Sequence, residues 1–180
     1  IDLALLLVLN KLLPNKENLL ILTYWLSPIL IFTTYVLGLN DLIPVFFLTF
    51  SLYTLSQKKW FISGFLLAAS LSSKISMLIA VPFFFFYFIN NKPLQFAIKQ
   101  FAYGFFIGCI LFFIPFLVSL EAINMLLGNP QIKEVFKLSI IIGDSVLYFV
   151  PLLYIVFLYV VWRFKRLNFQ LLMASIGVVF

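Results

Sequence analysis

Apolar runs separated by short polar interruptions extend along the whole chain. They fall at 1–13, 19–37, 42–57, 60–74, 76–90, 100–118, 146–162 and 167–180. A helix that crosses the hydrocarbon core of a bilayer needs ~20 residues, with a range of about 17–25. Runs 19–37, 100–118 and 146–162 reach that length, and the first and last runs are cut by the chain ends. The pattern therefore predicts an all-α fold, a polytopic transmembrane helix bundle of about eight membrane segments.

The composition indicates the same environment. Hydrophobic residues make up 64% of the chain, charged residues only 10%, and Phe alone occurs 24 times. Soluble proteins contain about 45–50% apolar residues, so this much apolar surface requires lipid as part of the solvent. The absence of His excludes Ser-His and Cys-His catalysis, and the single Cys109 forms no disulfide within the chain. We expect no metal site and no cofactor.

The chain starts at Ile1, without Met and inside an apolar run, and it ends at Phe180 inside another run. We therefore expect residues 1–180 to be part of one transmembrane domain of a longer protein. No signal peptide can be read from the sequence for the same reason.

The net charge of +6 predicts membrane topology rather than nucleic-acid binding, because the basic residues are scattered between apolar runs. If successive connections alternate sides, one side carries nine of the 12 basic residues: Lys11, Lys16, Lys58, Lys59, Lys92, Lys99, Arg163, Lys165 and Arg166. The other side carries three basic residues and five of the six acids: Lys74, Lys133, Lys137, Asp2, Asp41, Glu121, Glu134 and Asp144. The positive-inside rule makes the first side cytoplasmic. We expect a multi-pass integral membrane protein, in the plasma membrane of a prokaryote or the endoplasmic reticulum of a eukaryote.

The longest predicted outer connection covers residues 119–145. It contains two short apolar sets with charged residues between them, and Gly128-Asn129-Pro130 separates the sets as a stop-and-turn signal. The plain interpretation is an extracytoplasmic loop with two amphipathic helices lying in the membrane interface. A sharper alternative is a lid over a lipid-linked substrate.

The segment around Asn40 and Asp41 lies at the predicted outer face, after Ser27-Pro28, where Pro28 is expected to kink the preceding helix. Asp41 has a structural interpretation as the N-cap of the helix over 42–57, with Pro44 tolerated in its first turn. A capped carboxylate still has a second oxygen to offer a ligand. Both interpretations of Asp41 therefore stay open.

Lys74 ends a short apolar run, so a hairpin of the runs 60–74 and 76–90 places it below the outer headgroups. An ionisable residue at membrane depth is a functional hypothesis by default. The alternative is a lysine that extends to the headgroups. The serines around it fit a polar cavity or close helix packing, and Gly104 and Gly108 form a GxxxG pattern that predicts close helix contact.

Several of these residues carry a resemblance to a known family. The order Ser27-Pro28, then 35–41 (YVLGLND), then Gln57-Lys58-Lys59, Gly64 and Lys74 resembles the polytopic GT-C glycosyltransferases. It looks most like the polyprenyl-phosphate-mannose-dependent mannosyltransferases, including the catalytic subunit of the first GPI mannosyltransferase. The resemblance covers about residues 25–90. Leu39 stands where the family often has Gln, and the Pro often found soon after the Lys is absent.

The resemblance implies a fragment of a membrane glycosyltransferase that moves mannose or another hexose from a polyprenyl-phosphate donor to a glycan or lipid acceptor at the outer face. Lys74 would pair with the donor phosphate, and Asn40 and Asp41 would bind sugar hydroxyls or the acceptor. The catalytic base is expected upstream of this chain, in a first outer loop. The alternatives are a segment of a transporter or flippase, or a non-catalytic membrane subunit. The bilayer is a partner in every case, and nucleic acid in none.

Overall fold

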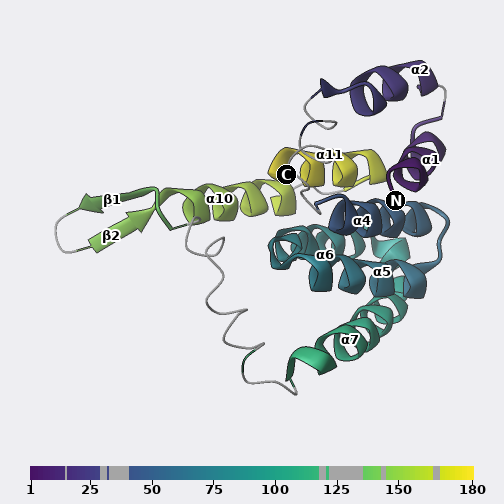
Figure 1. Cartoon of the computed structure of the whole chain (residues 1–180). Helices are drawn as coiled ribbons and strands as arrows, with labels where there is room; N and C mark the ends of the chain where they lie inside the picture. The colour runs from purple at the N-terminus through teal and green to yellow at the C-terminus, as the bar shows by residue number, and fades with distance from the viewer. Residues whose placement is uncertain are drawn as a thin grey trace. The chain divides into compact units, whose positions relative to one another are not determined.

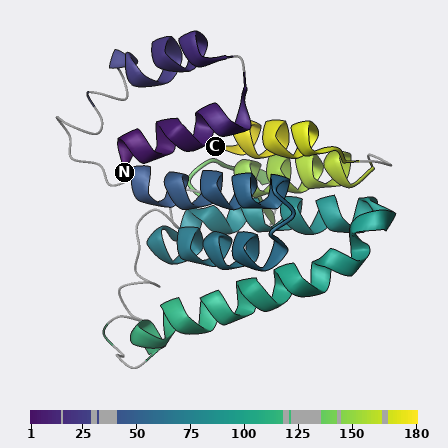
Figure 2. The ribbon, with the colours of Figure 1, turned by 90° about the vertical axis from the view of Figure 1, so that its right-hand side faces the viewer.

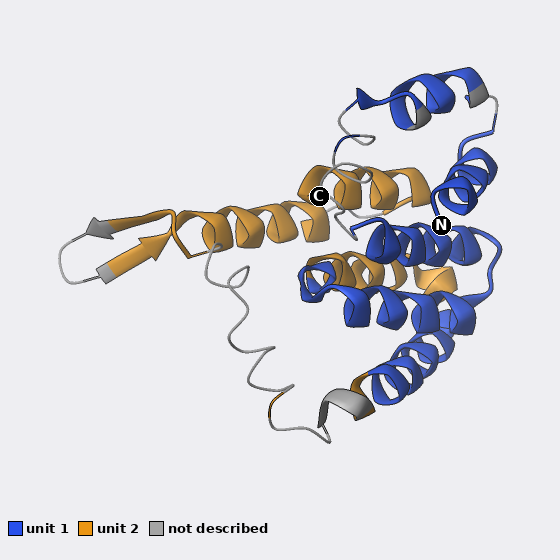
Figure 3. Ribbon diagram, in the orientation of Figure 1, with its two compact units in different colours: residues 1–78, 96–112 blue, residues 79–95, 113–180 orange. Residues whose placement is uncertain are grey.

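The computed structural model describes residues 1–14, 16–28, 32, 41–117, 121, 136–142, 145–163 and 167–180. These residues are predominantly helical, which confirms the predicted helical class (Figure 1). They divide into two compact units, residues 1–78 with 96–112 and residues 79–95 with 113–180 (Figure 3). The expectation of one transmembrane domain stays a prediction.

The described part of the first unit contains helices and no strand. Its elements are α1 (Asp2–Leu12), α2 (Glu17–Leu20), the π-helical turn η1 (Ile21–Trp25), α4 (Leu42–Ser56), α5 (Trp60–Ser73) and most of α7 (Gln95–Leu117). α4 and α5 pack extensively on each other, and they run side by side in Figures 1 and 2. α1 also packs on α4, and the Lys11 ammonium lies 5.7 Å from the centre of the Tyr53 ring.

The second unit combines helices with a β-hairpin. Its elements are the end of the 3₁₀-helix η3 (Ile75–Ala80), α6 (Val81–Asn90), the 3₁₀-turn η4 (Lys92–Leu94), β1 (Ser139–Ile142), β2 (Ser145–Tyr148), α10 (Phe149–Arg163) and α11 (Phe169–Val179). The Tyr154 hydroxyl donates to the Ile79 carbonyl oxygen at 3.0 Å, and the Asn90 amide donates to the Trp162 carbonyl oxygen at 3.3 Å. α6 and α10 therefore run parallel, as the predicted alternation of sides requires.

The predicted run 19–37 shows a break in its helix at Leu26-Ser27. Its helical start ends at Trp25, two residues before Ser27-Pro28, and residues 29–31 and 33–40 lie outside the described part of the chain. A residue that precedes proline is disfavoured in the helical region, which accounts for the break at Ser27, and Pro28 and Phe32 are again helical. The kink expected at Pro28 stays a prediction, because most of the residues that follow it lie outside the described part of the chain.

The predicted loop 119–145 differs as well. Residues 139–142 and 145–148 pair as antiparallel strands, so this part is not an interfacial helix, and the helix expected from 146 begins only at Phe149. The β-branched run Ile140–Ile142 favours a strand, and Gly143-Asp144 in the sequence is a hairpin signal. Residues 118–120 and 122–135, which include most of the two amphipathic helices expected within 119–145, lie outside the described residues, and residues 136–138 are not helical.

The turn between α4 and α5 closes in a Schellman arrangement. The Lys59 N–H donates to the Thr54 carbonyl oxygen at 2.9 Å, and the Lys58 N–H donates to the Leu55 carbonyl oxygen at 3.0 Å. Lys58 has a φ of 59°, in the left-handed region that this motif requires and that glycine adopts most easily. Lys58 and Lys59 are both exposed, so two lysines mark this end of the helical hairpin that α4 and α5 form.

Glycines set the contact between α5 and α7. A Cβ added to Gly64 would collide with the Phe101 carbonyl oxygen, and one added to Gly104 would collide with the Phe61 carbonyl oxygen. A Cβ on Gly108 would lie 2.7 Å from the Cβ of Ala68. The GxxxG prediction of close helix contact is thus confirmed, with Gly64 completing it from the other helix.

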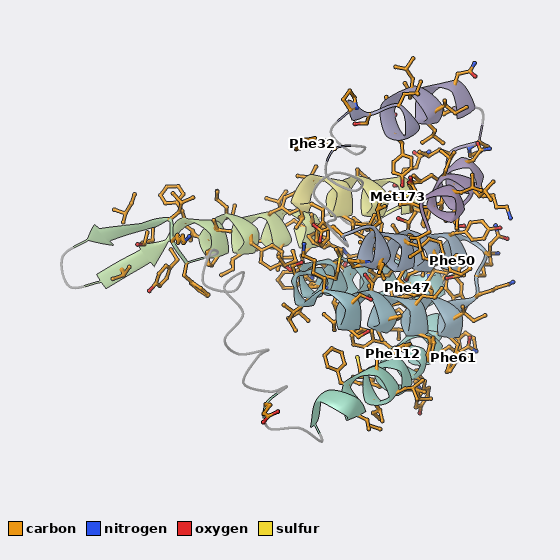
Figure 4. The ribbon with its side chains drawn as sticks, viewed as in Figure 1. Phe32, Phe47, Phe50, Phe61, Phe112 and Met173 are labelled. Atoms are coloured by element: carbon orange, nitrogen blue, oxygen red, sulfur yellow. The ribbon has the colours of Figure 1, made fainter. Side chains whose placement is uncertain are left out.

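Among the described residues, one helical segment, Lys92–Ile114, is long and apolar enough to cross a membrane. Large apolar side chains cover much of its surface, and Phe96 and Ile110 are 76% and 63% exposed. Figure 4 shows further aromatic side chains along the helices of the first unit, among them Phe47, Phe61 and Phe112. The other apolar helices of the described chain have fewer than 18 residues.

Candidate functional site

The antiparallel hairpin brings two of the three predicted site residues together. The Lys74 ammonium contacts the Asp41 carboxylate, with 2.7 Å between Nζ and Oδ1. Asp41 directly precedes α4 and Lys74 directly follows α5, so the pair lies at the end of the hairpin opposite the Lys58-Lys59 turn.

Further contacts between α4 and α5 set the register that aligns this pair. The Ser70 hydroxyl donates to the Pro44 carbonyl oxygen at 2.7 Å. Nearer the Lys58-Lys59 turn, two reciprocal hydrogen bonds join the helices. The Ser51 hydroxyl donates to the Ser63 carbonyl oxygen at 2.8 Å, and the Ser63 hydroxyl donates to the Ser51 carbonyl oxygen at 2.9 Å. These serines are fully buried, so their hydrogen bonds specify one register of the two helices.

Asp41 is not a side-chain cap. Its backbone angles, φ −66° and ψ −15°, are helical, and its carboxylate accepts no hydrogen bond from the first turn of α4. An N-cap side chain folds back when the residue has β-region angles, and it bonds the N–H of the second or third helical residue. The third residue here is Pro44, which has no N–H. The capping interpretation is therefore wrong, and Lys74 takes the carboxylate instead.

Lys74 occupies a break between two helices. Its backbone is extended, with φ −155° and ψ 118°, between the end of α5 and the start of η3. Its N–H still donates to the Ser70 carbonyl oxygen at 3.2 Å, and its carbonyl oxygen accepts from the Met77 N–H at 3.0 Å. The side chain of Lys74 is 24% exposed, whereas that of Asp41 is 58% exposed. The pair is thus open to solvent or to a ligand on the carboxylate side.

The serines near Lys74 indicate packing rather than a polar cavity. Ser70 bonds across to α4, while the hydroxyls of Ser72 and Ser73 both donate to the Ala69 carbonyl oxygen of their own helix, at 2.9 and 2.8 Å. The ammonium group therefore depends on Asp41 for its charged partner.

The pairing itself is what the sequence interpretation missed. An acid directly before one helix and a lysine directly after the next, on the same predicted side, is the signal that would have found it. Asn40 lies outside the described residues, so its place beside this pair stays a prediction.

The second unit holds an apolar cavity of about 600 Å³. Its walls come from three elements and comprise Ile79, Val150, Pro151, Leu153, Tyr154, Phe157, Val178 and Val179. The hydroxyl of Tyr154 is already used by the Ile79 carbonyl oxygen. The lining offers space to hydrocarbon and no charge. In the described part of the chain, no group of three or more Cys, Asp or Glu side chains is placed to hold a metal ion.

Comparison with known proteins does not add a family: no family model, no curated protein and no solved structure matches this chain.

Proposed function

We propose that this chain is a membrane-embedded helical domain of a glycosyltransferase that takes a hexose, such as mannose, from a polyprenyl-phosphate donor at the outer face. The observation that carries the proposal is the Asp41–Lys74 pair at one end of the α4–α5 hairpin. A phosphate needs a cation, and sugar hydroxyls need an acceptor such as a carboxylate. The Lys74 ammonium group and the Asp41 carboxylate supply this cation and this acceptor in direct contact with each other.

The multi-pass arrangement is part of this proposal. It is supported by helix directions within each unit, which follow the alternation that the charges predict. It is further supported by the position of Lys58 and Lys59 at one end of the hairpin and of Asp41 at the other, a separation that the positive-inside rule favours. The exposed apolar surface of α7 is typical of a helix that faces lipid.

The hairpin is short for a bilayer. α5 has 14 residues, a rise of ~21 Å at 1.5 Å per residue, against a hydrocarbon core of ~30 Å. If Lys58 and Lys59 reach the inner headgroups, Lys74 lies below the outer ones. Its pairing with Asp41 then lowers the cost of an ammonium group at that depth.

The chemistry proposed is transfer at the anomeric carbon. The acceptor hydroxyl oxygen bonds to that carbon, the bond from carbon to the donor phosphate oxygen breaks, and the polyprenyl phosphate leaves with the electron pair. The hydroxyl proton goes to a base, for which we name no residue of this chain. Lys74 contributes by holding the departing phosphate, whose negative charge it stabilises.

The test is sugar transfer in membranes that contain the full-length protein and a radiolabelled polyprenyl-phosphate hexose. Lys74→Met keeps the length of the side chain and removes its charge, and we expect a loss of about tenfold or more at equal protein amount, since a charged contact contributes ~1.5–3 kcal/mol. Lys59→Met, an exposed lysine at the other hairpin end, is the matched control. Movement of the lipid across a vesicle without transfer would instead favour a transporter or flippase, and neither activity would favour a non-catalytic subunit.

A further inference from the structure

The Asp41–Lys74 pair shows a property that sugar transfer alone does not require: the lysine is already neutralised by a side chain of the same chain. The Asp41 carboxylate accepts a hydrogen bond from the Lys74 ammonium group and makes no capping bond to α4. The contact joins one carboxylate oxygen to the ammonium group. A ligand that takes over the ammonium group therefore sets this carboxylate free.

We propose that Asp41 occupies the phosphate position on Lys74 when no ligand is bound, and that an arriving phosphate displaces it and releases the carboxylate to contact the rest of the ligand. The proposal rests on the proposed function for the identity of that ligand, a phosphate carried by a polyprenyl chain. It assigns Asp41 a regulatory part that a simple sugar-binding residue does not have.

The carboxylate side of the pair is accessible to an arriving ligand, because Asp41 is 58% exposed. A phosphate oxygen forms the same short, charge-assisted contact with an ammonium group as a carboxylate oxygen does. Exchange therefore replaces one such contact by another, and Lys74 is never left at membrane depth without an anion.

The proposal predicts the sign of a substitution effect. Asp41→Asn removes the internal competitor but keeps the size of the side chain, so a phosphate ligand without sugar should bind more tightly, by about threefold. If Asp41 only assisted ligand binding, the same change would weaken it. Lys74→Met should weaken binding by about tenfold. In the double variant, Asp41→Asn should bring no gain, because the group that it competes for is gone.

The experiment measures binding of farnesyl phosphate to the full chain in nanodiscs of uncharged phosphatidylcholine. Farnesol tests the need for the phosphate, and inorganic phosphate tests the need for the lipid chain. The proteins are the wild type, Asp41→Asn, Lys74→Met, the double variant and the control Lys59→Met. Thermal unfolding of each variant checks that it is folded. If Lys74→Met does not fold, the direction in which Asp41→Asn changes the affinity for farnesyl phosphate still tests the proposal.

The expected result is tighter farnesyl phosphate binding by Asp41→Asn, weaker binding by Lys74→Met, and unchanged binding by Lys59→Met. None of the substitutions should change the binding of farnesol, which has no phosphate. If the wild type binds farnesyl phosphate and Asp41→Asn binds it equally or more weakly, the displacement is overturned while the proposed function stands. Equal affinity and equal tightening for inorganic phosphate support the displacement but contradict a lipid-linked donor. Absence of binding of either anion to every variant overturns both proposals.

Discussion

Helix α5 contacts α4 and α7 in different ways. Towards α4 it uses hydroxyl groups, with the buried Ser51–Ser63 bonds in the middle of the contact and the Asp41–Lys74 pair at its end. Towards α7 it uses the absence of side chains, since Gly64 and Gly104 bring the two backbones together. Hydrogen bonds depend on matching positions along the helices, whereas a glycine contact depends on shape alone. The first contact therefore specifies register, and the second specifies distance.

The largest effect should come from the glycine contact. Gly104→Leu places a side chain against the Phe61 carbonyl oxygen, and because that atom is backbone, the two helices must move apart. We expect a loss of about 3 kcal/mol in the free energy of unfolding. Gly177→Leu in α11 is the control, since a Cβ there meets nothing within 4 Å. Thermal unfolding in nanodiscs measures both, and equal stability of the two variants would show that α5 and α7 are not in backbone contact.

The serine contact should give an intermediate effect. Ser63→Ala removes hydrogen bonds to Ser51 inside a buried contact, and we expect a loss of about 1 kcal/mol in the free energy of unfolding. A double-mutant cycle with Ser51→Ala should show coupling of the two sites. Ser56→Ala is the control, because that exposed hydroxyl bonds only the Tyr53 carbonyl of its own helix. Additive single effects would argue against the reciprocal bonds.

The ion pair should contribute less to stability than the serines. Asp41 is 58% exposed, and exposed pairs give between 0 and about 1 kcal/mol, so we expect a loss of about 0.5 kcal/mol for Asp41→Asn. The loss should shrink further in high salt. Unfolding of the nanodisc-embedded chain at two salt concentrations tests this. A loss as large as that of Ser63→Ala would mean that the pair holds the hairpin together and is no replaceable contact.

The smallest effect should come from the opposite end of the hairpin. Lys58→Gly relieves the left-handed backbone at φ 59° but adds freedom to the unfolded chain. We expect a net gain of about 0.3 kcal/mol in the free energy of unfolding. The neighbour Lys59→Gly, with φ −90°, has no such strain to relieve and should lose stability. Destabilisation by Lys58→Gly would contradict the turn geometry.

Most helices were predictable from the sequence because apolar runs bounded by polar residues define them. α4 and α5 end within a residue of the predicted limits, and α11 lies within the run 167–180. The run 146–162 was harder to predict, because its first residues, Val146–Tyr148, are equally compatible with a strand or a helix. Periodicity does not separate the two over so short a segment. The hairpin partner, β1, decides for the strand.

The sequence by itself determined the helical class, and its apolar runs and separated charges carry the prediction of a membrane topology. It also placed Asp41 and Lys74 next to helix ends. Only the tertiary structure decided what these polar residues do. A comparison of Asn168, which precedes α11, with Asp41, which precedes α4, shows this. Asn168 caps α11 by accepting from the Leu171 N–H at 2.8 Å, whereas Asp41 pairs with Lys74. The local signal is the same, but a cation delivered by the next helix attracts a carboxylate more strongly than the two N–H groups that Pro44 leaves in the first turn.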